Sequence, residues 1–116
     1  MRSLTGIQAL IEIRIPDGLT YEFKSMVFRQ LTEAITNIEK HAGATQVEVR
    51  LIERDGGVYG LVADNGRGFV VAERNNLPGH LGLLALKERA LMAGGWYKVE
   101  SEPGLGTRIE FWMPIA

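Results

Sequence analysis

One segment of the chain joins a carboxylate to closely spaced glycines. The sequence DNGRGF occupies residues 64–69, directly after an apolar stretch that is typical of a strand. Asp64, at the end of that strand, can present a fixed carboxylate to an amino group, and Gly66 and Gly68 let the backbone pass close to a planar ligand. A tight Asn-Gly turn is the alternative, because such turns are common in hairpins. Alone, the segment is weak evidence for a binding site.

A second glycine-containing segment lies where a helix is expected to begin. Residues 79–83 read GHLGL, and Gly79 and Gly82 would allow a ligand to approach closely. Unpaired backbone N–H groups and the positive end of the helix dipole favour a phosphate at such a position. A flexible loop that ends in a helix is the alternative. The segment GLGT at residues 104–107 could be only a hairpin turn.

A polar strip follows one face of the longest predicted helix. Its members are Glu33, Asn37, Lys40 and His41, and at about 100° per residue they share an arc of roughly 100°. The apolar residues of the helix occupy the adjoining arc, so the strip lies along the edge of the core. A solvated face with i,i+4 pairs, such as Glu33 with Asn37, is the alternative.

Hydrophobic periodicity predicts the elements that must position these segments. Alternation at residues 10–15 indicates a strand with one wet face, and three- and four-residue spacing at residues 21–41 indicates a helix. Further along, the patterns predict a hairpin, a long loop over residues 65–82, a second helix at 83–92 and two final strands at 96–101 and 107–113. We therefore expect an α/β fold in which two or three helices cover one face of a mixed sheet of about five strands.

Composition limits the class of protein. The chain has 116 residues, of which 46% are hydrophobic and 23% charged, and its formal net charge is -1. These values predict a single globular domain over residues 1–116, with its core at about 10–114, and give no sign of nucleic-acid or direct membrane binding. Cysteine is absent, which excludes disulfides and a thiolate nucleophile. No apolar run is long enough to span a bilayer, so we expect this piece to be soluble.

Taken in order, the four segments resemble the motifs of a known ATP-binding fold. The patterns ExxxNxxKH, DxGxGF, GHxGL and GT are similar to the N, G1, G2 and final Gly-Thr motifs of the GHKL superfamily of gyrase, Hsp90, histidine kinases and MutL. The resemblance covers the chain from about Leu10 to Pro114. The stretches TEAITN, KHA, HLGL and KERA are similar to sensor histidine kinases that partner helix-turn-helix, NarL-type response regulators. The resemblance implies the Bergerat fold, a two-layer α/β sandwich in which about three helices cover one face of a mixed sheet.

The resemblance also implies roles for single residues. Asp64 would accept a hydrogen bond from the exocyclic amine of adenine, supported by Thr107 through ordered water, and would disfavour the carbonyl of guanine. Asn37 would be a ligand of Mg²⁺, and Lys40 and His41 would meet phosphate oxygens. Glu33 is the candidate catalytic residue. The matching glutamate activates water in the superfamily's ATPases, whereas here it would orient Mg²⁺ or an incoming imidazole.

The remaining ATP-binding candidates belong to the two glycine-containing motifs. The segment at about 65–82 would be the ATP lid, which takes its mobility from its glycines. The candidates that these two motifs contribute are Gly66, Gly68, Gly79, His80, Gly82 and Leu83.

Two departures from the family pattern bear on activity. Glu39 adds a negative charge beside Lys40, although it should point to a different face. The only histidines, His41 and His80, lie inside nucleotide motifs, so neither matches the phosphoacceptor. We therefore expect a cytoplasmic kinase module that binds Mg²⁺-ATP and turns over little alone, because its acceptor is missing.

The resemblance predicts partners outside this chain. These are the dimerisation and phosphoacceptor helices of a parent kinase, which is itself soluble or membrane-anchored, and through the parent a response regulator. The short start from Met1 to Thr5 leaves no room for a dimerisation helix. We therefore expect either a fragment, monomeric in isolation, or a divergent single-domain protein. Two other functions stay open: an anti-sigma-factor serine kinase that sequesters a transcription factor, and a scaffold that binds no nucleotide.

Overall fold

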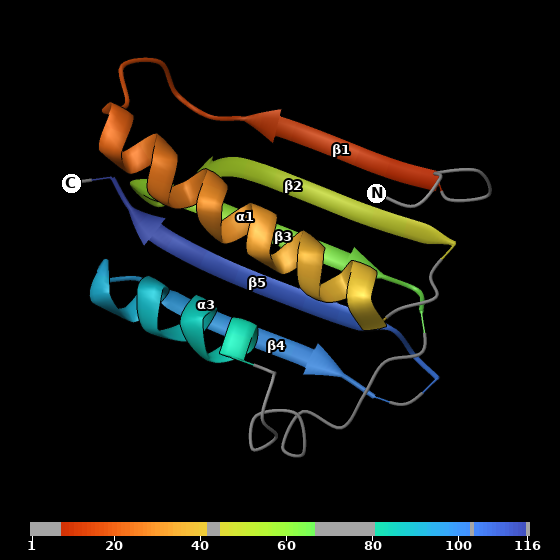
Figure 1. Ribbon diagram of the computed structural model, residues 1–116. Coiled ribbons are helices and arrows are strands. Elements are labelled where there is room, and N and C mark those ends of the chain that lie inside the picture. Colours follow the sequence, from red (N-terminus) through yellow and green to blue (C-terminus); the bar gives the residue numbers. More distant parts are fainter. Residues whose placement is uncertain (1–7, 42–44, 67–80, 103, 116) are drawn as a thin grey trace.

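The protein forms one five-stranded sheet with two helices on one face (Figure 1). The computed structural model describes residues 8–41, 45–66, 81–102 and 104–115, except for the side chains of residues 37–41, 81 and 82. In chain order the elements are β1 (Gln8–Arg14), α1 (Tyr21–His41), β2 (Gln46–Arg54), β3 (Gly57–Asp64), α3 (Leu81–Met92), β4 (Trp96–Ser101) and β5 (Thr107–Pro114).

The sheet is mixed, as predicted. Its strand order is β1-β2-β3-β5-β4, in which β1 and β2 are parallel and the other pairs are antiparallel. The predicted hairpin of β2 and β3 is confirmed. Its turn residues Asp55 and Gly56 have φ of 52° and 75°, the left-handed values that a two-residue hairpin turn requires.

The core lies between the sheet and the two helices. Alternate residues of the three central strands point toward the helices, and α1 presents Val27, Leu31 and Ala34 to them, each at most 6% exposed. Thr20 caps the start of α1, where its hydroxyl accepts from the N–H of Phe23 at 3.1 Å. The predicted α/β architecture is therefore confirmed. The described residues contain two helices where the sequence predicted about three.

The opposite face of the sheet is covered by its own long side chains. Tyr59 is 4% exposed there, with the guanidinium of Arg54 4.0 Å from its ring centre and its hydroxyl donating to Glu110 at 2.6 Å. A cation over an aromatic face and a satisfied hydroxyl allow a tyrosine to be buried without a covering helix. The sheet therefore needs no second helical layer at this point.

The edge strand β1 differs from its prediction. Leu10 is 72% exposed and Ile11 is 66% exposed, although they point to opposite faces. The expectation of a single wet face is therefore wrong for this strand. The helices lie over the middle of the sheet and over β4, so β1 extends beyond their cover (Figure 1). Among the described residues, neither helix is long and apolar enough to cross a membrane.

Candidate nucleotide site

Asp64 occupies the last position of the central strand β3. It pairs in register with Thr107, the first residue of β5. One carboxylate oxygen of Asp64, Oδ1, accepts a hydrogen bond from the backbone N–H of Gly66 at 2.6 Å. The other oxygen, Oδ2, is buried and has no hydrogen-bond partner within the described part of the chain. A buried acceptor without a partner is costly, so Oδ2 is available to a ligand donor.

The surroundings of Asp64 disfavour its charged form. Burial raises the pKa of this carboxyl above its ordinary value, and the backbone N–H groups of Gly66 and Thr107 partly offset the rise. A donor that reached Oδ2 would stabilise the ionised carboxylate further. Until such a donor is present, the buried charge of Asp64 is only partly compensated.

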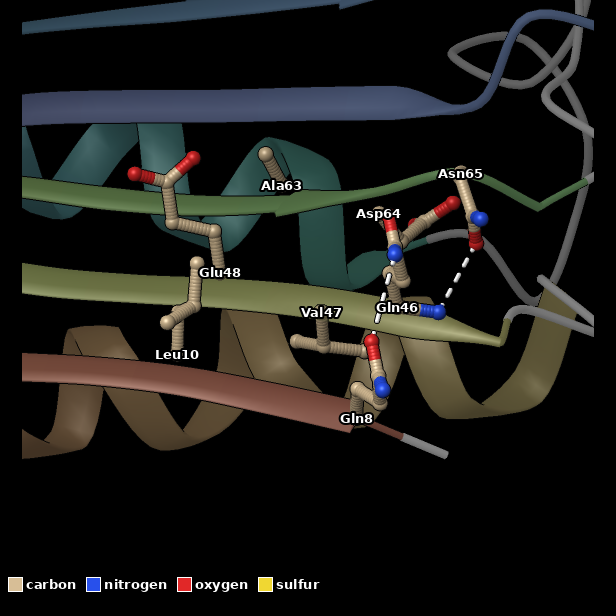
Figure 2. A pocket seen from close by; sticks show the side chains of 8 residues that line it. All are labelled: Gln8, Leu10, Gln46, Val47, Glu48, Ala63, Asp64 and Asn65. Carbon is tan, nitrogen blue, oxygen red and sulfur yellow. Dashed lines mark hydrogen bonds between the residues drawn. The ribbon is translucent and has the colours of Figure 1, made fainter. Parts of the chain in front are cut away.

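Two hollows border Asp64 at this end of the sheet. The smaller, of about 280 Å³, lies toward β1 and β2, and Figure 2 shows Asp64 and Asn65 there beside Gln46 and Gln8. The larger, of about 600 Å³, lies toward β4 and β5 and is lined by Ser101 and Thr107 as well as Asp64. The second hollow brings together the carboxylate and the threonine that the sequence singled out.

Hydroxyl groups continue the polar row from Asp64 across the sheet. The hydroxyl of Ser101 donates to the carbonyl of Gly106 at 2.9 Å and lies 3.0 Å from that of Thr107. Thr107 is 8% exposed, which is unusual for a threonine. Because the hydroxyl hydrogen of Ser101 is directed at a carbonyl, Thr107 is the donor between the two side chains. Thr107 then keeps acceptor capacity for water or an amine.

Gly106 brings the final turn against the strand that carries Asp64. Its φ is 84°, and a Cβ built on it would lie 2.2 Å from the carbonyl oxygen of Asp64. Only glycine satisfies both the left-handed backbone and this close approach. The Gly-Thr pair therefore contributes to the site through backbone shape as well as through the hydroxyl.

Asn65 fixes the neighbouring chain at the start of β2. Its amide oxygen accepts from the backbone N–H groups of Thr45 and Gln46 at 3.0 and 2.9 Å, and its amide nitrogen donates to the Thr45 hydroxyl at 2.9 Å. From the sequence pattern, Asn65 was interpreted only as part of an Asn-Gly turn. Its three long-range bonds could not be inferred from local turn preferences.

Glu33 lies on α1 and is held by arginines. Its carboxylate contacts Arg89 of α3 at 3.0 Å and Arg29 at 3.7 Å. Asn37, Lys40 and His41 continue α1 in the following turns, but their side chains lie outside the described residues. The helix predicted to carry the polar strip is therefore confirmed, and the convergence of Asn37 with Asp64 stays a prediction.

The structure covers only part of the two glycine-containing motifs. Gly68, Gly79 and His80 lie outside the described residues. Gly82 belongs to the first turn of α3. Leu83 is 3% exposed and packs in the core rather than on the surface, so within the described residues its contacts are apolar.

The chain is similar in sequence to known ATPases and sensor kinases. Residues 24–116 match the family model described as "Histidine kinase-, DNA gyrase B-, and HSP90-like ATPase". The chain belongs to this family. Sensor protein VraS of Staphylococcus aureus strain COL is 34% identical over 109 residues, which cover 94% of this chain and 30% of VraS. Sensor histidine kinase YdfH of Bacillus subtilis strain 168 is 32% identical over 112 residues, which cover 96% of this chain and 28% of YdfH.

Solved structures agree on the fold of this ATPase-family domain. A blue-light-activated histidine kinase of Erythrobacter litoralis EL346 superposes with a TM-score of 0.79 at 21% identity, over 95% of this chain and 36% of that one. The ATP-binding domain of PrrB from Mycobacterium tuberculosis gives 0.66 at 24% identity, over 96% of this chain and 82% of that one. The chain therefore has the fold of histidine kinase ATP-binding domains and spans under a third of the sensor kinases VraS and YdfH.

Proposed function

We propose that this domain binds ATP for a two-component sensor histidine kinase and presents the γ-phosphate to a histidine on a separate dimerisation domain. Family membership supports the nucleotide, and the similarity to VraS and YdfH supports the kinase. ShkA, which is 25% identical with a TM-score of 0.76, was solved in complex with AMPPNP. These relatives favour a sensor kinase over an anti-sigma regulator or a scaffold.

One observation carries the proposal for base recognition. Asp64 Oδ2 is buried and unpartnered among the described residues, and the residue Asp64 lines a hollow together with Thr107. An exocyclic amine supplies the missing donor, whereas the carbonyl at the same position of guanine would face the carboxylate as a second acceptor. Thr107 would support the amine through a water molecule. Between the two purines, adenine is therefore the base that this end of the sheet favours.

The phosphates and their metal ion are assigned to α1. Asn37 would supply its amide oxygen to Mg²⁺, and Lys40 and His41 would contact phosphate oxygens. The ion, when bound, would screen phosphate charge during transfer. Gly66, Gly68, Gly79, His80 and Gly82 would line the nucleotide along the lid. Glu33 would orient Mg²⁺ or the incoming imidazole.

The partners of the chain follow from the same proposal. The domain would work in the cytoplasm beside the dimerisation and phosphoacceptor helices of its parent, which passes the phosphoryl group to a response regulator. The stretches TEAITN and KERA favour a regulator with a NarL-type helix-turn-helix. In isolation the domain would bind ATP as a monomer with slow hydrolysis, because its acceptor is on another domain.

Calorimetric titration of the 116-residue chain with ATP and GTP, with and without Mg²⁺, tests the proposal. We expect ATP to bind and GTP to bind at least about tenfold more weakly, because GTP places two acceptors face to face. In the Asp64→Asn variant we expect ATP affinity to fall roughly 10- to 100-fold. Asp55→Asn is the matched control, since Asp55 lies in the exposed β2–β3 turn with a φ that asparagine tolerates.

Two outcomes would contradict the proposal. If the folded wild-type protein bound no adenine nucleotide, the proposed function would be wrong. Equal affinity for ATP and GTP, unchanged by Asp64→Asn, would show that the base does not reach Asp64.

A further inference from the structure

A buried amide joins the two helices and fixes an arginine beside Glu33. Gln30 of α1 is 0% exposed. Its side-chain nitrogen donates to the carbonyl of Leu86 on α3 at 2.7 Å, and its oxygen accepts from Arg89 at 2.8 Å. The second terminal nitrogen of Arg89 donates to Glu33 at 3.0 Å. The guanidinium therefore spans a buried amide and a carboxylate on successive turns of α1.

Arg89, rather than Arg29, is the effective partner of Glu33. The side chain of Arg89 is 20% exposed and that of Arg29 is 72% exposed, with contacts of 3.0 and 3.7 Å to Glu33. Exposed pairs contribute little because water screens them and both side chains lose freedom. A guanidinium that is already held by a buried amide loses little further conformational freedom when it pairs with a carboxylate. Glu33 is thus neutralised from α3.

We propose that Arg89 is a positioning residue for nucleotide binding. By holding and neutralising Glu33, it keeps a negative charge one helical turn before Asn37 from repelling the phosphates. The inference rests on the proposed function, which assigns the phosphates to this part of α1. An unpaired carboxylate at Glu33 would act on a polyphosphate and leave an uncharged nucleoside unaffected.

Affinities for ATP and adenosine, measured without Mg²⁺ on the 116-residue chain at low ionic strength, test this role. We expect Arg89→Ala to weaken ATP roughly fivefold and to leave adenosine within about twofold. Arg89→Lys keeps the charge and should retain most of the ATP affinity. Adding Glu33→Gln to Arg89→Ala should restore ATP binding, because the unpaired anion is gone. Arg29→Ala is the control and should change neither ligand.

Glu33→Gln alone keeps the bond between Gln30 and Arg89, so it tests the proposal even if Arg89→Ala does not fold. We expect this variant to bind ATP more tightly and adenosine unchanged, with the gain disappearing at high salt. Parallel losses of ATP and adenosine in Arg89→Ala, without rescue by Glu33→Gln, would overturn the proposal. ATP binding by the wild-type chain is measured first in each experiment. A wild-type chain that does not bind ATP would refute the proposed function, whereas the variants test only the role of Arg89.

Discussion

Asp64 and Thr107 stand directly opposite each other on β3 and β5. One carries a buried oxygen without a partner in the described residues, and the other carries a buried hydroxyl tied to Ser101. Neighbouring strands thus supply two hydrogen-bond acceptors at one end of the sheet. The register of β3 and β5 places Asp64 opposite Thr107, so this juxtaposition depends little on side-chain flexibility.

The hydroxyl of Thr107 should matter for the base and little for the phosphates. In Thr107→Val we expect ATP and adenosine to weaken equally, by roughly three- to tenfold, because one hydrogen-bonding group is lost. Titration of both ligands measures this. Thr32→Val is the control, since within the described residues the Thr32 hydroxyl donates only to the Phe28 carbonyl of its own helix. A loss confined to ATP would place Thr107 at the phosphates instead.

Two glycines in the last turn provide a test of close packing. Gly104 and Gly106 both have φ of 84°, but only Gly106 lies against Asp64. Gly104→Ala should lower the free energy of unfolding by about 1 kcal/mol through backbone strain alone. Gly106→Ala should lower it by a further ~1–3 kcal/mol and weaken ATP, because the added methyl displaces the end of β3.

Urea unfolding and ATP titration of the two variants separate strain from displacement. Equal stability and equal ATP affinity in Gly104→Ala and Gly106→Ala would contradict the prediction. The methyl added at residue 106 would then have no effect on the end of β3 beyond backbone strain.

The buried carboxyl should make stability depend on pH in a defined direction. The pKa of Asp64 is raised above its ordinary value of 3.8 by burial, so the folded chain binds this proton more tightly than the unfolded chain. The contribution of Asp64 to stability therefore falls as the pH rises from about 3.8 through the raised pKa, and is level above it. Asp64→Asn should be the more stable protein near pH 7.

Denaturant titrations across this pH range measure the difference between the two proteins. The advantage of Asp64→Asn should shrink toward the acid end. If the stability advantage of Asp64→Asn did not change with pH, it would have a cause other than the ionisation of Asp64.

Asn65 should contribute to stability through its amide oxygen. Asn65→Ala removes the acceptor of the N–H groups of Thr45 and Gln46. Because these groups are exposed and water can bond to them instead, we expect a loss of about 0.5–1.5 kcal/mol in the free energy of unfolding. Asn65→Asp keeps the acceptor and should lose less. Urea titration gives both values. If the two variants were equally unstable, the acceptor would not be the stabilising group.

Local pattern was sufficient for most of the elements. Apolar periodicity predicted the first helix and four of the strands, a continuous apolar run predicted the strand before Asp64, and helix-forming residues followed by Gly94 and Gly95 predicted the second helix. Asp64 was singled out because a carboxylate followed an apolar strand. Pairing between distant segments was not predictable in this way. The parallel pairing of β1 with β2 joins residues 38 positions apart, and no local preference encodes it.

The ion pair between Glu33 and Arg89 was missed for the same reason. It joins residues on two helices that are 56 positions apart in sequence, and from α1 alone Glu33 appeared to pair with Asn37. The one available signal was Gln30, a polar residue between the apolar positions Val27 and Leu31. A buried glutamine needs a partner from another element, and that partner brings Arg89 with it.

Because β3 lies in the middle of the sheet, local fluctuations should disturb the base-recognition residue Asp64 little. Hydrogen bonds hold β3 to β2 on one side and to β5 on the other, so Asp64 is attached to a strand whose release requires breaking both ladders. Amide hydrogens of Val58 to Val62 should accordingly exchange with solvent at the rate set by global unfolding. A destabilising change far from the site would then reduce the population of competent molecules while leaving the intrinsic affinity of each one for the base intact.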